Sequence, residues 1–190
     1  RRLNRLFFKA DMVCVSPIAV GSGKSEYTDN DVLVDSEGRP FIPGTTIAGV
    51  CRHYLEGQGE DVSDLFGNDQ GEKSESKIIF YEAFLKNKAV IGQRDGVAIN
   101  YDTETAKDGA LFNYEVVGEN SKFDLRIELD DDENNSGKEY IKRIINGFNK
   151  GFIRIGFKTS RGFGRVRLDK CRLAAVNDIN DLIGFSWDKV

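Results

Sequence analysis

Residues Gly21 to Ser25 read GSGKS, a run that suggests a phosphate-binding loop. A Walker A loop also needs a glycine five positions before its Gly-Lys-Ser and a helix directly after it, so that backbone amides surround the phosphates. Here the earlier position is Ile18, and the following EYTDNDVLVD is acidic and then strand-like. The pattern therefore argues against a nucleotide hydrolase.

The sequence IPGTT at 42–46 is a second stretch that could bind an anion. A Pro-Gly turn there precedes a predicted helix, and a helix N-terminus with two hydroxyl groups suits a phosphate. Gly44, Thr45 and Thr46 are its candidate contacts. A helix simply capped by Thr45 explains the same residues, and for IPGTT taken alone it is the preferred interpretation.

The sequence SRGFG at 160–164 is a glycine-rich loop between two predicted strands. Its glycines would let the backbone approach a sugar-phosphate chain, while Phe163 could stack on a base and Arg161 could bind a phosphate. An ordinary hairpin loop is the alternative. The surrounding charge favours the first interpretation, because one acid, Asp169, accompanies eight basic residues: Lys150, Arg154, Lys158, Arg161, Arg165, Arg167, Lys170 and Arg172.

The amino-acid composition indicates the class of protein in which these motifs occur. The 190 residues fit one domain, and 39% hydrophobic with 31% charged residues indicate a globular protein. No apolar run is long enough to span a membrane and no signal-peptide cleavage site is present, so we expect a cytoplasmic protein. Three widely spaced cysteines predict buried thiols rather than disulfides or a zinc site. The missing initial methionine suggests a trimmed chain or a piece of a longer polypeptide.

Apolar periodicity predicts the elements that position these loops. Strands are expected at the start of the chain (RLFFKADMVCV), at 77–85, at 123–129, and on both sides of the glycine loop (FIRIGF and GRVRLDKCRL). Hairpins are expected at 31–42 and 95–117. Helices are expected from Pro43-Gly44 to Gly57 and, after a capping box of Ser136 and Glu139, to Gly151. This order predicts an α+β, ferredoxin-like (RRM-like) βαββαβ fold with an inserted β-hairpin.

The ordered set of these segments resembles the RAMP superfamily of CRISPR-associated proteins. The motifs are GSG, GRPFIPGTTIAGVCR, LFG at 65–67, IIFYEAFL, GVAINYDTETAKDGALFNYEVV and GFKTSRGFGRV. Within that superfamily the chain is most similar to the backbone subunits of type III effector complexes. The resemblance covers nearly the whole chain.

The resemblance implies one domain, 1–190, with a ferredoxin-like palm and a thumb hairpin inserted at about 95–117. Such subunits assemble along a CRISPR guide RNA, with copies of themselves and other effector subunits, and bind single-stranded target RNA. The implied guide contacts are Gly44, Thr45, Thr46, Arg52, Lys158, Ser160, Arg161, Gly162, Phe163 and Gly164. Family members often carry lysines in the helix after the Pro-Gly turn. Here Ala48 and Val50 stand at those positions, which leaves Arg52 as the remaining cation.

The resemblance also implies an aspartate, in the loop after the first strand, on which cleavage of the target RNA depends. Counting back from Ile42-Pro43-Gly44 places it at Asp29, with Asp31 as the runner-up. We expect Asp29 to be the catalytic residue and a ligand of a divalent metal, Mg²⁺. A carboxylate there can bind the metal or take a proton from the 2′-hydroxyl that attacks the adjacent phosphorus.

Two alternatives share the same fold. In the first, the acidic loop is inert and the chain is a purely structural RNA-binding subunit. In the second, the chain processes precursor guide RNA with His53 as general base, as some superfamily relatives do. His53 follows Arg52 on the predicted helix without an obvious partner, so a surface or interface histidine is the preferred interpretation.

Overall fold

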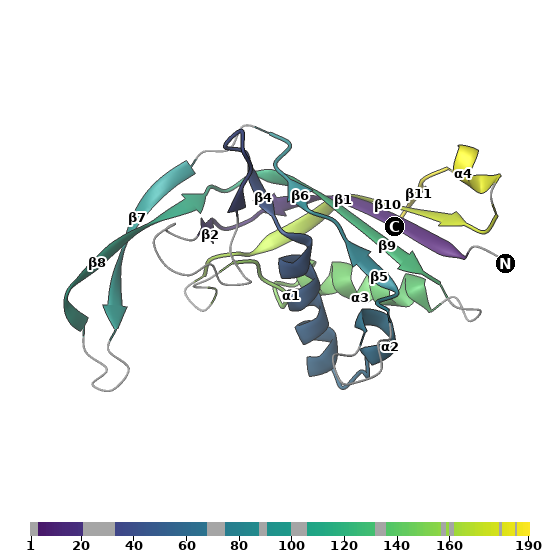
Figure 1. Ribbon diagram of the computed structural model, residues 1–190, viewed down its shortest axis with the longest axis horizontal. Coiled ribbons are helices and arrows are strands. Elements are labelled where there is room, and N and C mark those ends of the chain that lie inside the picture. The colour runs from purple at the N-terminus through teal and green to yellow at the C-terminus, as the bar shows by residue number, and fades with distance from the viewer. Residues whose placement is uncertain are drawn as a thin grey trace.

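The computed structural model describes residues 4–20, 33–67, 75–87, 91–99, 106–131, 136–156, 159, 162–178, 180–184 and 186–190. These residues form an α+β fold in which neighbouring strands pair in antiparallel sheets, which confirms the predicted class. Figure 1 shows a central sheet, helices beneath it, and a long hairpin that extends to one side.

A five-stranded sheet forms the centre of the molecule, in the order β11, β10, β1, β9, β5. Its strands are β1 (Arg5–Cys14), β5 (Ile78–Phe80), β9 (Lys122–Asp130), β10 (Val166–Val176) and β11 (Asp188–Lys189). Successive side chains of a strand point to opposite faces, and the buried face carries apolar residues. Phe8 lies opposite Ile127 and Met12 opposite Phe123. The strands predicted at the start of the chain, at 123–129 and after the glycine loop are confirmed.

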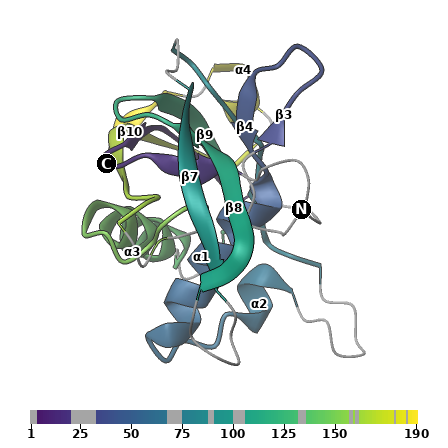
Figure 2. The ribbon, with the colours of Figure 1, turned by 90° about the vertical axis from the view of Figure 1, so that its left-hand side faces the viewer.

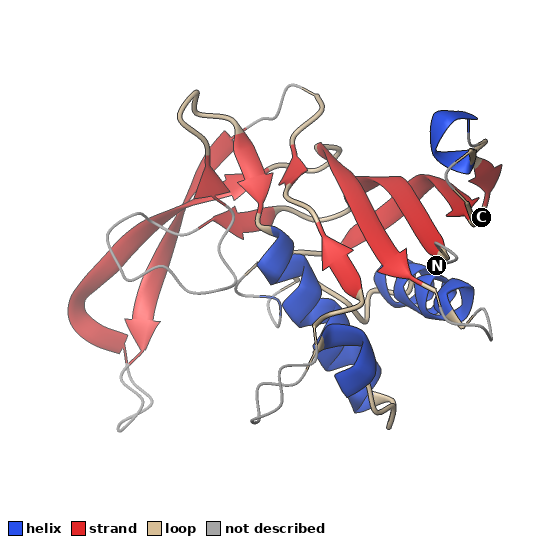
Figure 3. Ribbon diagram, turned by 45° about the vertical axis from the view of Figure 1, so that its right-hand side comes forward, coloured by secondary structure: helices blue, strands red, loops and turns tan. Residues whose placement is uncertain are grey.

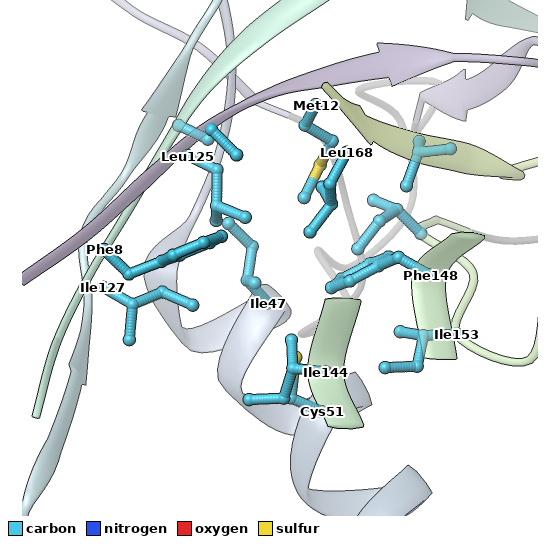
Figure 4. Close-up of a cluster of buried hydrophobic side chains, with 14 of the residues drawn as sticks. Phe8, Met12, Ile47, Cys51, Leu125, Ile127, Ile144, Phe148, Ile153 and Leu168 are labelled. Carbon is cyan, nitrogen blue, oxygen red and sulfur yellow. The ribbon is translucent and has the colours of Figure 1, made fainter. Parts of the chain in front are cut away.

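Two helices, α1 (Gly44–Gly57) and α3 (Gly137–Asn149), cover one face of this sheet (Figure 3). Each carries a buried apolar stripe at helical spacing, which includes Ile47 and Cys51 in α1 and Ile144 and Phe148 in α3. Figure 4 shows these stripes against side chains of the sheet. Full burial of each large apolar side chain contributes about 1.5–3 kcal/mol, so this core holds the helices in place. Two short helices complete the fold, α2 (Ser63–Phe66) and α4 (Asp181–Gly184).

Two smaller sheets lie beside the central one. The first joins β2 (Ile18–Val20), β8 (Ala106–Val117) and β7 (Ile91–Ile99), and the second joins β3 (Leu33–Val34), β4 (Pro40–Ile42) and β6 (Ala83–Phe84). Strands β7 and β8 pair as the predicted hairpin, which begins at Ile91 rather than Asp95. It extends to one side of the central sheet in Figure 1, and in Figure 2, which is seen from that side, it lies in front of the rest of the fold. The hairpin predicted at 31–42 is confirmed by the pairing of β3 with β4.

Two strand predictions were wrong. The segment 77–85 is not one strand, because β5 pairs with β9 and β6 pairs with β4 of another sheet. FIRIGF does not form a strand either: in its described residues, 152–156, only Arg154 makes an isolated bridge, to Arg165. Alternation of apolar residues predicted both strands, but the partners available in three dimensions decide the pairing.

The predicted helix caps were confirmed only in part. At α1 the N-cap is Pro43 rather than Thr45. At α3 the N-cap is Ser136, as predicted, but its side chain makes no capping hydrogen bond. The Gly137 amide of α3 instead donates to Asp131 Oδ1 at 2.9 Å. A carboxylate from the preceding strand end thus replaces the capping box.

The three cysteines, Cys14, Cys51 and Cys171, are buried free thiols, as predicted. Burial raises the pKa of the Cys14 thiol to about 12 and also raises those of Cys51 and Cys171. All three therefore stay protonated near neutral pH and are unsuited to nucleophilic chemistry. None of the described helices is both long and apolar enough to cross a membrane.

Candidate nucleic-acid interface

The N-terminus of α1 is held closely against the central sheet. A Cβ atom on Gly44 would lie 2.1 Å from the Phe80 carbonyl oxygen, so glycine is needed for this contact. The cap, Pro43, offers no side-chain acceptor, and the first turn contains no acid. Neither the cap nor the first turn of this helix therefore supplies an anion to the positive end of its dipole.

The other predicted contacts on α1 differ in their exposure. Thr45 is exposed, whereas Thr46 is buried, with 2% of its surface accessible. Arg52 is half-buried, and its Nε donates to Glu56 Oε1 at 2.8 Å. His53 is exposed. Of the predicted α1 contacts, Thr45 is the side chain most open to a ligand, and Arg52 would share its charge with Glu56.

The described part of the glycine loop is fixed by the backbone around it. Gly164 donates to the Pro17 carbonyl and accepts from the Ile155 amide, both at 2.9 Å. Its φ is +80°, and a Cβ would lie 2.0 Å from the Ile155 carbonyl oxygen. Gly162 also has a positive φ, +92°, but faces open space. Gly164 therefore allows packing within the protein, whereas Gly162 is exposed and its amide donates to the Thr159 carbonyl at 3.2 Å.

Phe163 does not extend freely from this loop. It is half-buried and packs against a small cluster formed by Ala19 of β2 and Val116 of β8. The same loop is anchored to the end of β1, because the Arg165 carbonyl accepts from the amides of Val15 and Ser16. Phe163 thus connects the glycine loop to the sheet that carries the projecting hairpin, and its stacking on a base remains a prediction.

The connection from α3 to β10, residues 150–165, gathers positive charge. Arg154 and Arg165 lie opposite each other in a backbone bridge. The Arg154 guanidinium donates to the carbonyls of Gly151 and Thr159, at 3.3 and 3.2 Å. Like charges placed opposite each other repel unless an anion lies between them. This arrangement is suited to a phosphate-bearing ligand.

Several predicted site residues lie outside the described residues, namely the GSGKS run, Asp29, Asp31, Lys158, Ser160 and Arg161. In the part of the chain that the structure describes, no group of three or more His, Cys, Asp or Glu side chains could hold a metal ion. The assignment of Asp29 as catalytic residue and metal ligand stays a prediction.

An exposed aromatic residue near the loop was missed by the sequence analysis. Phe152 is 67% exposed and follows directly on α3. It was assigned to a strand, where a phenylalanine is expected to be buried. The signal that could have found it is the preceding Lys150-Gly151, because glycine after the last helical turn ends a helix and starts a new chain direction.

Comparison with known proteins identifies the fold family. A family model described as the RAMP superfamily matches residues 11–167. A curated protein of Methanocaldococcus jannaschii, named CRISPR system Cms endoribonuclease Csm3, is 26% identical in an alignment of 173 residues that covers 77% of this chain and 69% of that protein.

Two solved structures share the fold. The first is a Csm3–Csm4 subcomplex of the type III-A CRISPR-Cas interference complex (TM-score 0.66, 18% identity, 100% of this chain and 90% of that chain). The second is a type III-B Cmr-beta complex bound to cognate target RNA (TM-score 0.65, 17% identity, 92% of this chain and 62% of that chain). Because the family model spans most of its length, this chain belongs to the RAMP superfamily.

Proposed function

We propose that this chain is a guide-RNA-binding backbone subunit of a type III CRISPR interference complex, and that it cleaves bound target RNA through Asp29. The observation that carries the proposal is its similarity to a relative named an endoribonuclease, together with membership of the RAMP superfamily. Two features are consistent with a phosphate-bearing partner: the start of α1, whose cap and first turn supply no anion, and the basic connection from α3 to β10.

The proposed palm has a ferredoxin-like plan. Its strands β1, β5, β9 and β10, with α1 and α3, follow one another as strand, helix, strand, strand, helix, strand, and the sheet order is β10, β1, β9, β5. The β7–β8 hairpin is the proposed thumb, which would interrupt pairing between guide and target. Its extension to one side of the central sheet supports this role (Figure 1).

The proposed cleavage uses the target RNA's own nucleophile. The Asp29 carboxylate takes the proton of a 2′-hydroxyl, and the 2′-oxygen attacks the adjacent phosphorus. The bond to the 5′-oxygen breaks, and this oxygen receives the proton. The products are a 2′,3′-cyclic phosphate and a 5′-hydroxyl end. A divalent metal, expected to be Mg²⁺, would supply positive charge to the phosphate oxygens.

The test uses the protein assembled with guide RNA and any co-encoded subunits. A labelled complementary target is added with and without Mg²⁺, to the wild type, Asp29→Ala and Asp31→Ala. We expect regularly spaced cuts that need the metal, and a loss of roughly 10²–10⁴-fold in rate for Asp29→Ala, the range of one general base. Target binding should be unchanged in both variants, and mass spectrometry should find the cyclic phosphate.

The other outcomes separate the alternatives. Target binding without cuts in the wild type would make the chain a structural subunit. Cuts that survive Asp29→Ala but disappear in Asp31→Ala would move the catalytic role to Asp31, and cuts that survive both would place it in another subunit. Metal-independent cleavage of a hairpin precursor, lost in His53→Ala, would indicate guide processing instead.

A further inference from the structure

Phe152 is placed on the surface by the end of α3. The Gly151 amide donates to the Phe148 carbonyl and the Phe152 amide to the Gly147 carbonyl, at 3.0 and 2.9 Å, and Gly151 has a φ of +77°. These are the two hydrogen bonds of a Schellman motif. In that motif the residue at the Phe152 position commonly packs against the one at the Gly147 position. Glycine there offers no side chain, so the Phe152 ring must find another support.

Tyr54 of α1 supplies that support. Its ring stacks on the Phe152 ring with a centroid separation of 6.3 Å and an angle of 13° between the planes. Tyr54 itself packs against Gly147, where an added Cβ would lie 2.7 Å from its ring, and its hydroxyl accepts from Gln58 Nε2 at 2.9 Å. One face of the Phe152 ring is therefore fixed on the protein, while the residue is 67% exposed to solvent.

Three basic residues lie close to Phe152 in the chain or against its neighbour Gly151, and none has a carboxylate partner among the described residues. Lys150 and Arg165 are exposed, and the Arg165 side chain lies against Gly151, with its Nε 3.2 Å from where a Cβ would be. Arg154 donates to main-chain carbonyls only. Across the described ranges, no carboxylate lies within ion-pair distance of Lys150, Arg154 or Arg165. The surface thus combines an exposed flat ring with uncompensated positive charge.

We infer that Phe152 is a stacking platform for a base of single-stranded RNA, and that Lys150 and Arg165 bind the flanking phosphates. This inference rests on the proposed function and extends the RNA contact from the glycine loop to the exposed side of α1 and α3. Single-stranded RNA presents flat bases and regular negative charge together, which matches this surface. An acidic peptide would pair with the cations but would leave the ring without a partner.

The test measures binding of a short fluorescein-labelled single-stranded RNA to the purified chain, by fluorescence anisotropy at several salt concentrations. Phe152→Ala should weaken binding about five- to 100-fold, the range of one base–aromatic stack. The salt dependence should be unchanged, because a stacking contact releases no counterions. With an RNA whose bases are replaced by abasic sites, Phe152→Ala and wild type should bind equally. Phe152→Trp should restore binding to the base-bearing RNA.

The matched control is Phe84→Ala, since Phe84 is also an exposed ring stacked on another aromatic residue. It should bind RNA like the wild type. Wild-type affinity in Phe152→Ala, with weaker binding in Arg165→Glu, would overturn the platform but leave the proposed function intact. A change in self-association without a change in RNA binding would overturn it in favour of a protein contact. If the wild type binds no RNA, alone or in the assembled complex, the proposed function itself fails.

Discussion

Two partly exposed aromatic pairs have similar geometry but different electrostatic surroundings. Phe41 and Phe84 stack with centroids 5.4 Å apart, and Tyr54 and Phe152 with centroids 6.3 Å apart. The Arg39 guanidinium lies 5.9 Å from the Phe84 ring centroid. At the second pair, the Arg165 side chain lies against Gly151, the residue before Phe152.

The difference lies in what balances the cation. Arg39 Nε pairs with Asp35 Oδ2 at 2.9 Å and lies 3.4 Å from Glu37 Oε2. Hydrogen bonds from the Arg39 and Glu37 amides and side-chain contacts with Arg39 lower the pKa of Asp35, so its carboxylate stays ionised near neutral pH. Around Phe152, by contrast, the described residues provide main-chain carbonyls but no carboxylate. A ring beside a cation indicates an anionic ligand only where the protein leaves that cation uncompensated.

The largest effect is expected when the close packing of Gly164 in the basic connection is disturbed. Gly164→Ala adds a Cβ that would lie 2.0 Å from the Ile155 carbonyl oxygen, at a φ of +80°. Left-handed backbone and overpacking together should lower the free energy of unfolding by roughly 3 kcal/mol. Gly162→Ala is the matched control, because it has a positive φ but open space. Gly162→Ala should lower the free energy of unfolding, measured in urea, by about 1 kcal/mol. Equal losses in the two variants would show that the close contact of Gly164 contributes nothing to stability.

The next largest effect is expected for a charge reversal at Arg165, with the same change at Arg39 as the comparison. Arg165→Glu should weaken RNA binding about tenfold at low salt, a cost of about 1.4 kcal/mol. The salt slope, which is the slope of log affinity against log salt concentration, should fall by about one phosphate contact. Arg39→Glu should change neither quantity measurably, because the Arg39 charge is already balanced within its own turn. Anisotropy titrations over a range of salt concentrations measure both variants. A salt slope that falls equally in Arg39→Glu would remove the distinction between the two surfaces.

Local sequence patterns predicted most of the central sheet and both long helices, because alternation and helical spacing are properties of a short segment. They failed where the partner lies outside the segment. The break after Phe80 arises because β5 and β6 join different sheets. The first amide of α3 donates to Asp131, six residues earlier, rather than to a side chain of the helix start. Neither partner can be identified from spacing within the segment itself.

The candidate interface was predicted in outline and differs in detail. The basic connection and the glycine loop were identified from the sequence. The sequence does not show that Gly164 packs against the Ile155 backbone while Gly162 faces open space. Thr46 is buried and Phe163 packs on a second cluster, whereas Phe152 is the most exposed aromatic ring among the described residues. The position of Phe152 depends on a helix end and on a tyrosine of another helix, which no single segment encodes.

The smallest effect is expected when the surface around Arg39 is made electrostatically similar to the surface around Phe152. Asp35→Asn with Glu37→Gln removes both acids that balance Arg39, and asparagine keeps an acceptor for the backbone amides of Glu37 and Arg39. Because an exposed ion pair contributes about 0.2–1 kcal/mol, RNA affinity should rise roughly one- to fivefold at low salt, and the gain should disappear at high salt. Asp64→Asn with Glu119→Gln, at two exposed acids elsewhere on the surface, is the control for the same change in net charge. A gain in the first double variant that exceeds this control would show that internal acids keep the Phe41–Phe84 pair from binding RNA. Equal gains would mean that the two aromatic pairs differ in geometry rather than in charge.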